Sequence, residues 1–182
     1  MTEQRPGIRP RPSLGRRLDE WSRRSFPAAA TLALILCLEA PLGIPVSAQL
    51  QTALPLASLY FWSVHRPTSM PPWLVFGLGL LVDLLQIQPM GLSSLVFLLM
   101  VALARRWRHD LRRLGFMLGW LGFALAMLGA VLLMYVASSL LRWRLLPPAP
   151  CVDEWILALL FYPALAVLFG HAHRHAAAPE QA

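Results

Sequence analysis

Six apolar segments, separated by short polar or proline-rich stretches, constrain this sequence more than any of its other features. They cover about residues 26–43, 48–64, 72–87, 92–104, 115–141 and 155–170. A helix needs about 20 apolar residues to cross a bilayer core, so some segments, the fourth above all, are short. Helices are still favoured, because backbone groups in lipid must find partners within their own segment. The sequence predicts an all-α polytopic membrane protein with six transmembrane helices.

The composition agrees with this interpretation. Of the 182 residues, 57% are hydrophobic and only 14% are charged, whereas about a quarter of the residues in a soluble domain are charged. A net charge of +7 would suggest a nucleic-acid partner for a soluble protein. In a membrane protein it reports topology instead, so we expect no nucleic-acid partner.

The arginines orient the six segments. All sixteen basic residues are arginine. With an even number of crossings, fourteen of the sixteen lie on one side, in the two tails and in the loops after the second and fourth segments. Because basic residues concentrate on the cytoplasmic side, the sequence predicts that both termini are cytoplasmic. Arg142 and Arg144 then lie on the outer side.

These boundaries divide the chain into four regions. Residues 1–13 are rich in proline and arginine and are expected to form a disordered cytoplasmic tail. Residues 14–25 fit a short amphipathic helix on the membrane surface, with an unstructured basic leader as the alternative. Residues 26–171 form the six-helix transmembrane domain, and residues 172–182 form a second cytoplasmic tail.

The third apolar segment carries one full charge, Asp83. A charge in a membrane is costly and normally faces protein or a wet cavity. Since the first and third segments both run outward, Glu39 and Asp83 lie at a similar depth near the outer surface. The expected intramembrane polar cluster and turn comprise Glu39, Asp83, Gln86, Pro89, Gly91 and Ser93.

Two roles are open for Asp83. Pro89 and Gly91 are typical of a tight turn, and we expect Asp83 to anchor that turn by accepting hydrogen bonds from backbone N–H groups or from Ser93. The alternative is an ion pair with one of the two outer cations, Arg142 or Arg144.

Two further patterns concern packing and the membrane surface. Small residues recur along one face of the fifth segment at Gly115, Gly119, Gly122, Ala126 and Gly129. Such a face permits close helix contact, either within the chain, in a homodimer or with another protein. The third segment has Gly77 and Gly79, where we expect close packing. A cytoplasmic basic loop contains Arg105, Arg106, Arg108, Arg112 and Arg113, and the simplest partner for it is anionic lipid.

No catalytic or metal-binding set is recognisable. The predicted topology places Ser93 and Ser94 on the outer side and all five histidines on the cytoplasmic side, so no serine–histidine pair can form. The alternating histidines of HAHRH, residues 171–175, have no cysteine or carboxylate beside them. We expect no enzyme activity, no cofactor and no metal.

The stretch Leu54–Pro67, LPLASLYFWSVHRP, followed by GLGLLVDLLQIQPMGLSSL, resembles the MreD family of bacterial rod shape-determining membrane proteins. That family is recognised by a glycine and an intramembrane aspartate that precede a Pro-Leu-Gly turn. The matching positions here are Gly79, Asp83, Pro89, Met90 and Gly91. Methionine stands where the family usually has leucine, and the resemblance is specific over about residues 54–100.

The resemblance implies a non-catalytic scaffold in the bacterial inner membrane. Its implied partners are MreC, the actin-like MreB, and the RodA glycosyltransferase with its transpeptidase partner, which together direct lateral peptidoglycan synthesis. The basic loop would contact either MreB or lipid headgroups. The family fold is similar to the substrate-binding subunits of energy-coupling vitamin transporters. The alternative function is therefore a small-molecule-binding transporter subunit with its ligand near Glu39 and Asp83.

Overall fold

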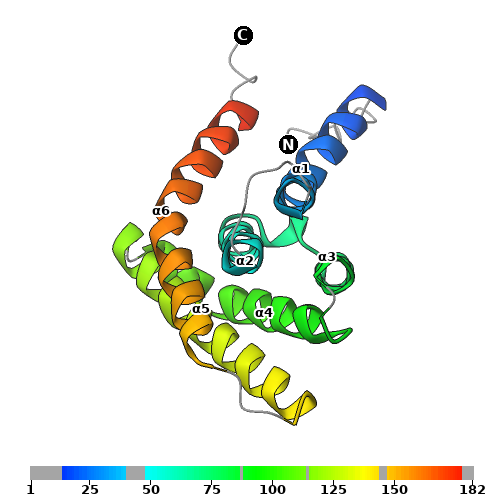
Figure 1. Cartoon of the computed structure of the whole chain (residues 1–182). Helices are drawn as coiled ribbons and strands as arrows, with labels where there is room; N and C mark the ends of the chain where they lie inside the picture. Colours follow the sequence, from blue (N-terminus) through cyan, green and yellow to red (C-terminus); the bar gives the residue numbers. More distant parts are fainter. Residues whose placement is uncertain (1–13, 40–47, 87, 114, 144–146, 178–182) are drawn as a thin grey trace, which may run out of the picture.

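The chain folds as a bundle of helices (Figure 1). The computed structural model describes residues 14–39, 48–86, 88–113, 115–143 and 147–177. All regular structure in these residues is helical. The elements are α1 (Leu14–Glu39), α2 (Ala48–His65), the 3₁₀ turn η1 (Pro67–Ser69), α3 (Pro72–Leu85), α4 (Leu92–Arg113), α5 (Gly115–Leu141) and α6 (Ala149–Ala177).

Within the described residues, each predicted apolar segment corresponds to a helix of its own; residues 40–43 of the first segment lie outside them. The bounds of α5 are those expected, and α2 and α3 differ from expectation by one or two residues. The first helix is longer than expected. It runs without a break through the predicted boundary between residues 25 and 26, with Pro27 inside it. The last helix likewise begins before residue 155 and continues to Ala177. The tail of residues 1–13 lies outside the described residues.

α2 is the central helix. It contacts α1, α4, α5 and α6, and Figure 1 shows it between them. Every residue from Pro55 to Val64 is buried. Burial on all sides is typical of a helix enclosed by other helices, so α2 needs no lipid-compatible surface.

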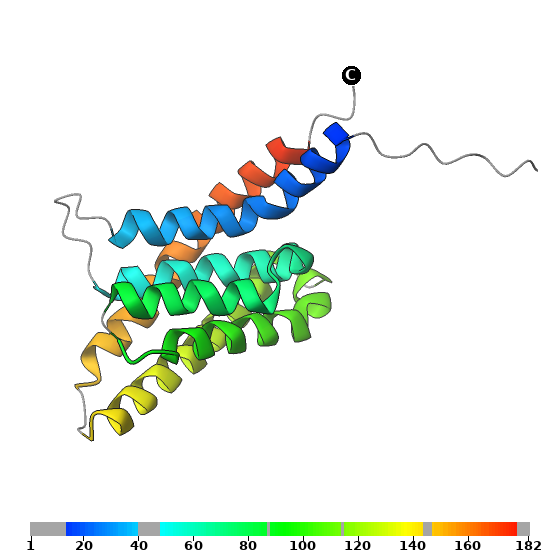
Figure 2. The same cartoon turned by 90° about the vertical axis from the view of Figure 1, so that its right-hand side faces the viewer.

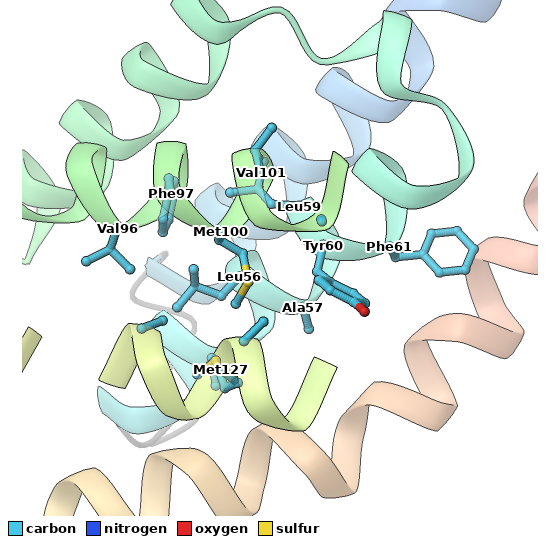
Figure 3. Close-up of a cluster of buried hydrophobic side chains, with 14 of the residues drawn as sticks. Leu56, Ala57, Leu59, Tyr60, Phe61, Val96, Phe97, Met100, Val101 and Met127 are labelled. Atoms are coloured by element: carbon cyan, nitrogen blue, oxygen red, sulfur yellow. The ribbon is translucent and has the colours of Figure 1, made fainter. Parts of the chain in front are cut away.

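The core forms where α2, α4 and α5 meet (Figure 3). Leu56 and Tyr60 of α2, Phe97 and Met100 of α4, and Met127 of α5 are almost fully buried there. Aromatic rings extend the core toward α6. In particular, the rings of Phe123 and Tyr162 stack with their centroids 4.2 Å apart. Two indole N–H groups also join α5 to α6: Trp120 donates to the Leu159 carbonyl and Trp155 donates to the Ala124 carbonyl. These contacts hold α5 and α6 together.

The outer surface of α5 and α6 is apolar. The exposed large hydrophobic side chains of these two helices are leucine, valine and phenylalanine on both, methionine on α5 and isoleucine on α6. Gly115–Leu141 and Ala149–His171 are each long and apolar enough to cross a membrane, and Ser25–Glu39 and Pro72–Leu85 are shorter apolar helices. An exposed apolar surface of this extent is unfavourable in water and compatible with lipid.

The antiparallel order gives the molecule two distinct ends (Figure 2). α1, α3 and α5 finish, and α2, α4 and α6 begin, at the end that we call the Asp83 end. The opposite end contains η1 and the last turns of α4, and we call it the Arg105 end. The predicted polar cluster and the predicted basic loop thus lie at opposite ends of the bundle.

Candidate functional site around Asp83

The Asp83 side chain caps a neighbouring helix. It lies in the last turn of α3 and is 1% exposed. Its Oδ2 accepts the Gly91 N–H at 2.8 Å, and its Oδ1 accepts the Ser93 N–H at 2.9 Å. The first N–H groups of a helix have no partner within the helix and carry partial positive charge. Asp83 supplies that partner for the beginning of α4, which confirms the expected hydrogen bonds from backbone N–H groups.

The turn between α3 and α4 wraps around this carboxylate. Gln88 N–H donates to the Asp83 carbonyl at 3.1 Å, and Leu92 N–H donates to the Pro89 carbonyl at 3.2 Å. Gly91 has φ of +92°. This left-handed conformation is unfavourable for any L-residue that has a side chain. The predicted turn residues therefore have separate tasks: Pro89 accepts a hydrogen bond, and Gly91 reverses the chain.

α3 and α4 approach each other closely one helical turn before Asp83. A Cβ placed on Gly79 would lie 2.4 Å from the Ser94 Cα, which is impossible without moving the backbone. The Ser94 hydroxyl donates to the Phe76 carbonyl at 3.0 Å. Residues four apart share a helix face, so Gly79 and Asp83 together hold α3 against α4. Close packing was also expected at Gly77. That expectation was wrong, because a Cβ there would meet nothing within 4 Å.

A second group of polar side chains, which we call the Gln86 network, joins three helices beside this turn. The Gln86 amide donates to the Glu39 carboxylate at 2.8 Å and accepts from the Gln88 amide at 2.9 Å. The Thr52 hydroxyl is a more distant donor to Gln86, at 3.4 Å. Glu39 and Asp83 thus lie at the same end, as expected from sequence, and Gln86 lies between the helices that carry them.

The alternative role of Asp83 as an ion-pair partner finds no support in the described residues. Arg142 is exposed after the end of α5, and no ion pair to Asp83 forms within the part of the chain that the structure describes. Arg144 lies outside that part. The Ser93 hydroxyl is buried without a hydrogen-bond partner, so Ser93 contributes its backbone N–H to Asp83 rather than its side chain.

A cavity of about 320 Å³ opens next to the Gln86 network, between α2, α3, α5 and α6. Its lining residues are Thr52, Gln86, Gln88, Val131, Met134, Tyr135, Ser138, Arg142, Pro147, Pro150, Cys151 and Glu154. One carboxylate oxygen of Glu154 is buried there without a partner. Sequence reasoning missed Thr52 and Glu154. Glu154 could have been noticed as a carboxylate directly before the sixth apolar segment. Because that segment was taken to begin at residue 155, Glu154 was assigned to the loop before it.

The predicted basic loop is instead helical, which corrects that expectation. α4 continues through the basic segment to Arg113, and α5 begins at Gly115 with φ of +84°. The Arg105 guanidinium turns inward and donates to the carbonyls of Pro67 and Met70. Arg106 is exposed and Arg108 contacts His109 at 3.4 Å. The side chains of Arg112 and Arg113 are outside the described residues.

Three of the five residues of the small-residue face of α5 have no neighbour close to where a side chain would stand, within the described residues. A Cβ at Gly115, Gly119 or Gly129 would meet nothing within 4 Å. Gly122 is half-buried and Ala126 is buried. The structure therefore contradicts internal packing for most of this face, because open space lies beside three of its five residues.

One comparison with known proteins gives a match. A family model described as rod shape-determining protein MreD matches residues 27–171. The matched range contains the whole Asp83 turn, the Gln86 network and the cavity. No curated protein and no solved structure matched the chain.

Proposed function

Because this chain belongs to the MreD family of rod shape-determining membrane proteins, we propose that it is a non-catalytic scaffold of the inner-membrane complex that maintains rod shape. The hydrogen bonding of Asp83 is the observation that supports the scaffold role. Both oxygens of this buried carboxylate accept backbone N–H groups of another helix. A carboxylate engaged in this way holds the fold together, and at 1% exposure it is closed to a ligand from solvent.

The proposed topology has six membrane-spanning helices with both termini in the cytoplasm. The antiparallel order of the helices supports it, as does the apolar surface of α5 and α6. The arginine distribution then assigns the Asp83 end to the outer side and the Arg105 end to the cytoplasm. α1 and α3 have the shorter apolar stretches, which tilt and local thinning of the bilayer accommodate at modest cost.

The proposed partners are MreC, MreB, and RodA with its transpeptidase partner, for the purpose of directing lateral peptidoglycan synthesis. The outward face of α5 supports a protein contact within the membrane, since open space beside its glycines lets another helix approach closely. A second copy of this chain is the alternative occupant of that face. The exposed Arg106 supports a cytoplasmic contact with lipid headgroups or with MreB.

The cavity at the Asp83 end favours a second candidate, a small-molecule-binding subunit of a transporter. Its volume of about 320 Å³ is at the lower limit of pockets that hold small ligands, about 300–1,000 Å³. The two candidate functions differ in which residues they require. It requires the cavity residues, whereas the scaffold requires the α3–α4 contact and the outer helix faces.

Replacement of the chromosomal copy tests the scaffold directly. Cells that lose the protein should round up, and both the wild type and Asp153→Asn, a change at an exposed carboxylate of α6, should restore rods. Asp83→Ala should fail to restore them because the start of α4 loses its cap. Rod-shaped cells in the absence of the protein would contradict the proposed function.

A further inference from the structure

The cavity at the Asp83 end contains one unsatisfied carboxylate oxygen. Oε1 of Glu154 is buried and accepts no hydrogen bond. A buried acceptor without a partner costs free energy, and a charged one costs more. Glu154 lines the cavity, so a rotation of its carboxylate would bring this oxygen to a donor that enters from outside the chain.

The same cavity contains a cation. Arg142 lines it, and the guanidinium forms no ion pair within the described residues. A ligand with only a positive group would leave Arg142 unused, and a ligand with only a negative group would leave Glu154 unsatisfied. The two side chains together favour a ligand that carries both charges.

The remaining walls suit a small polar group attached to an apolar body. Thr52, Gln88 and Ser138 offer hydroxyl and amide groups, while Val131 and Met134 are apolar. α5 ends and α6 begins beside this cavity, and these are the two helices that are long and apolar enough to cross a membrane. The cavity therefore lies where lipid headgroups meet the protein.

We propose that this cavity binds a phosphoethanolamine group, with the ammonium at Glu154 and the phosphate at Arg142. Phosphatidylethanolamine carries this group on a lipid, and free phosphoethanolamine carries it in solution. Phosphatidylglycerol has no ammonium, and the trimethylated ammonium of phosphatidylcholine has no N–H to donate. The proposal uses the six-span topology only to assign the outer leaflet.

A cysteine in the cavity wall provides the readout. Cys151 lines the cavity and is half-buried. The chain has two cysteines, and the other, Cys37, is exposed on α1. Cys37→Ala thus leaves a single thiol whose modification by a maleimide slows when the cavity is occupied.

The rate of Cys151 modification should be measured for the Cys37→Ala chain in nanodiscs of phosphatidylethanolamine, phosphatidylglycerol or phosphatidylcholine. We expect modification several-fold slower in phosphatidylethanolamine than in the other two. Glu154→Gln should remove the difference, and the neighbouring Asp153→Asn, whose side chain is exposed, should keep it. Equal rates in all three lipids, or a difference that survives Glu154→Gln, would overturn the proposal.

A second arm distinguishes the source of the group. Free phosphoethanolamine is added to the same chain in phosphatidylcholine nanodiscs. Protection that depends on Glu154 supports a soluble ligand, and protection only by the lipid supports a headgroup site. Absence of protection by both would overturn the proposal. Nanodiscs expose both faces of the membrane, so these results do not depend on the proposed topology. The topology is tested separately, by labelling Cys151 in intact cells with an impermeant maleimide.

Discussion

Asp83 explains why an apolar helix carries a charge. Its carboxylate is buried, yet both oxygens have N–H partners at the beginning of α4. Charged hydrogen bonds contribute more than neutral ones, and the partial positive charge of a helix N-terminus favours an anion. At the residue scale the aspartate is therefore a cap supplied by one helix to the next.

Asp83→Asn and Asp83→Ala should differ in stability. Asparagine keeps one acceptor oxygen but turns an NH₂ group toward one backbone N–H, whereas alanine leaves both N–H groups without this partner. We expect a loss of about 2 kcal/mol for asparagine and roughly twice that for alanine. Thermal unfolding of the purified variants in one detergent would measure this order, and equal losses would contradict the capping role.

Gly91→Ala should also lower the melting temperature. The φ of +92° at this position disfavours a Cβ by about 1–2 kcal/mol, while no neighbouring atom would obstruct it. Gly91→Asn should lose less, because asparagine adopts positive φ more readily. The same thermal assay applies, and an unchanged Gly91→Ala variant would contradict the strained turn.

At the element scale, the α3–α4 pair depends on one close approach. Gly79→Ala should push the helices apart, because its Cβ would overlap the Ser94 backbone. We expect a loss of about 3 kcal/mol or more, at the upper end of overpacking effects. Gly77→Ala, on the same helix and facing open space, is the matched control and should be neutral or slightly stabilising. Equal effects at the two positions would contradict the packing role of Gly79.

The end of α4 positions η1 through Arg105. Arg105→Ala should release the carbonyls of Pro67 and Met70, so backbone amides near η1 should exchange with deuterium several-fold faster. Arg106→Ala, at an exposed side chain, should leave that exchange unchanged. A similar rate for both variants would show that the two hydrogen bonds do not hold the turn.

Helix existence was predictable from sequence, and some helix ends were not. The apolar run of α5 defines both of its bounds, because it starts at Gly115, whose φ is +84°, and ends directly before Arg142. α4 extends nine residues past its apolar run, since arginine and leucine are good helix formers. Hydropathy shows only where the chain leaves an apolar medium, not where a helix ends.

The small-residue face of α5 shows a similar limit of sequence reasoning. The spacing of its residues identifies a helix face, but not which neighbour covers that face.

The candidate site was predictable to the extent that it is local in sequence. Asp83 and Gly91 lie eight residues apart around one turn, so their contact followed from the turn chemistry. Glu154 lies on the last helix, and its approach to Thr52 and Gln86 depends on how α6 packs on α2. No spacing rule contains that information.

At the scale of the whole molecule, the two ends have different chemistry. The Asp83 end combines the helix cap, the Gln86 network and a cavity, and the Arg105 end presents exposed basic residues. Between them lies a largely apolar outer surface. This distribution fits the membrane scaffold that we propose.

Affinity purification from native membranes tests the scaffold role most directly. The tagged chain is isolated in mild detergent and its partners are identified by mass spectrometry, with an unrelated tagged membrane protein as control. The account predicts recovery of MreC or RodA. Recovery of a transporter ATPase pair with its coupling subunit, and of neither MreC nor RodA, would contradict it and assign the cavity to a transported ligand.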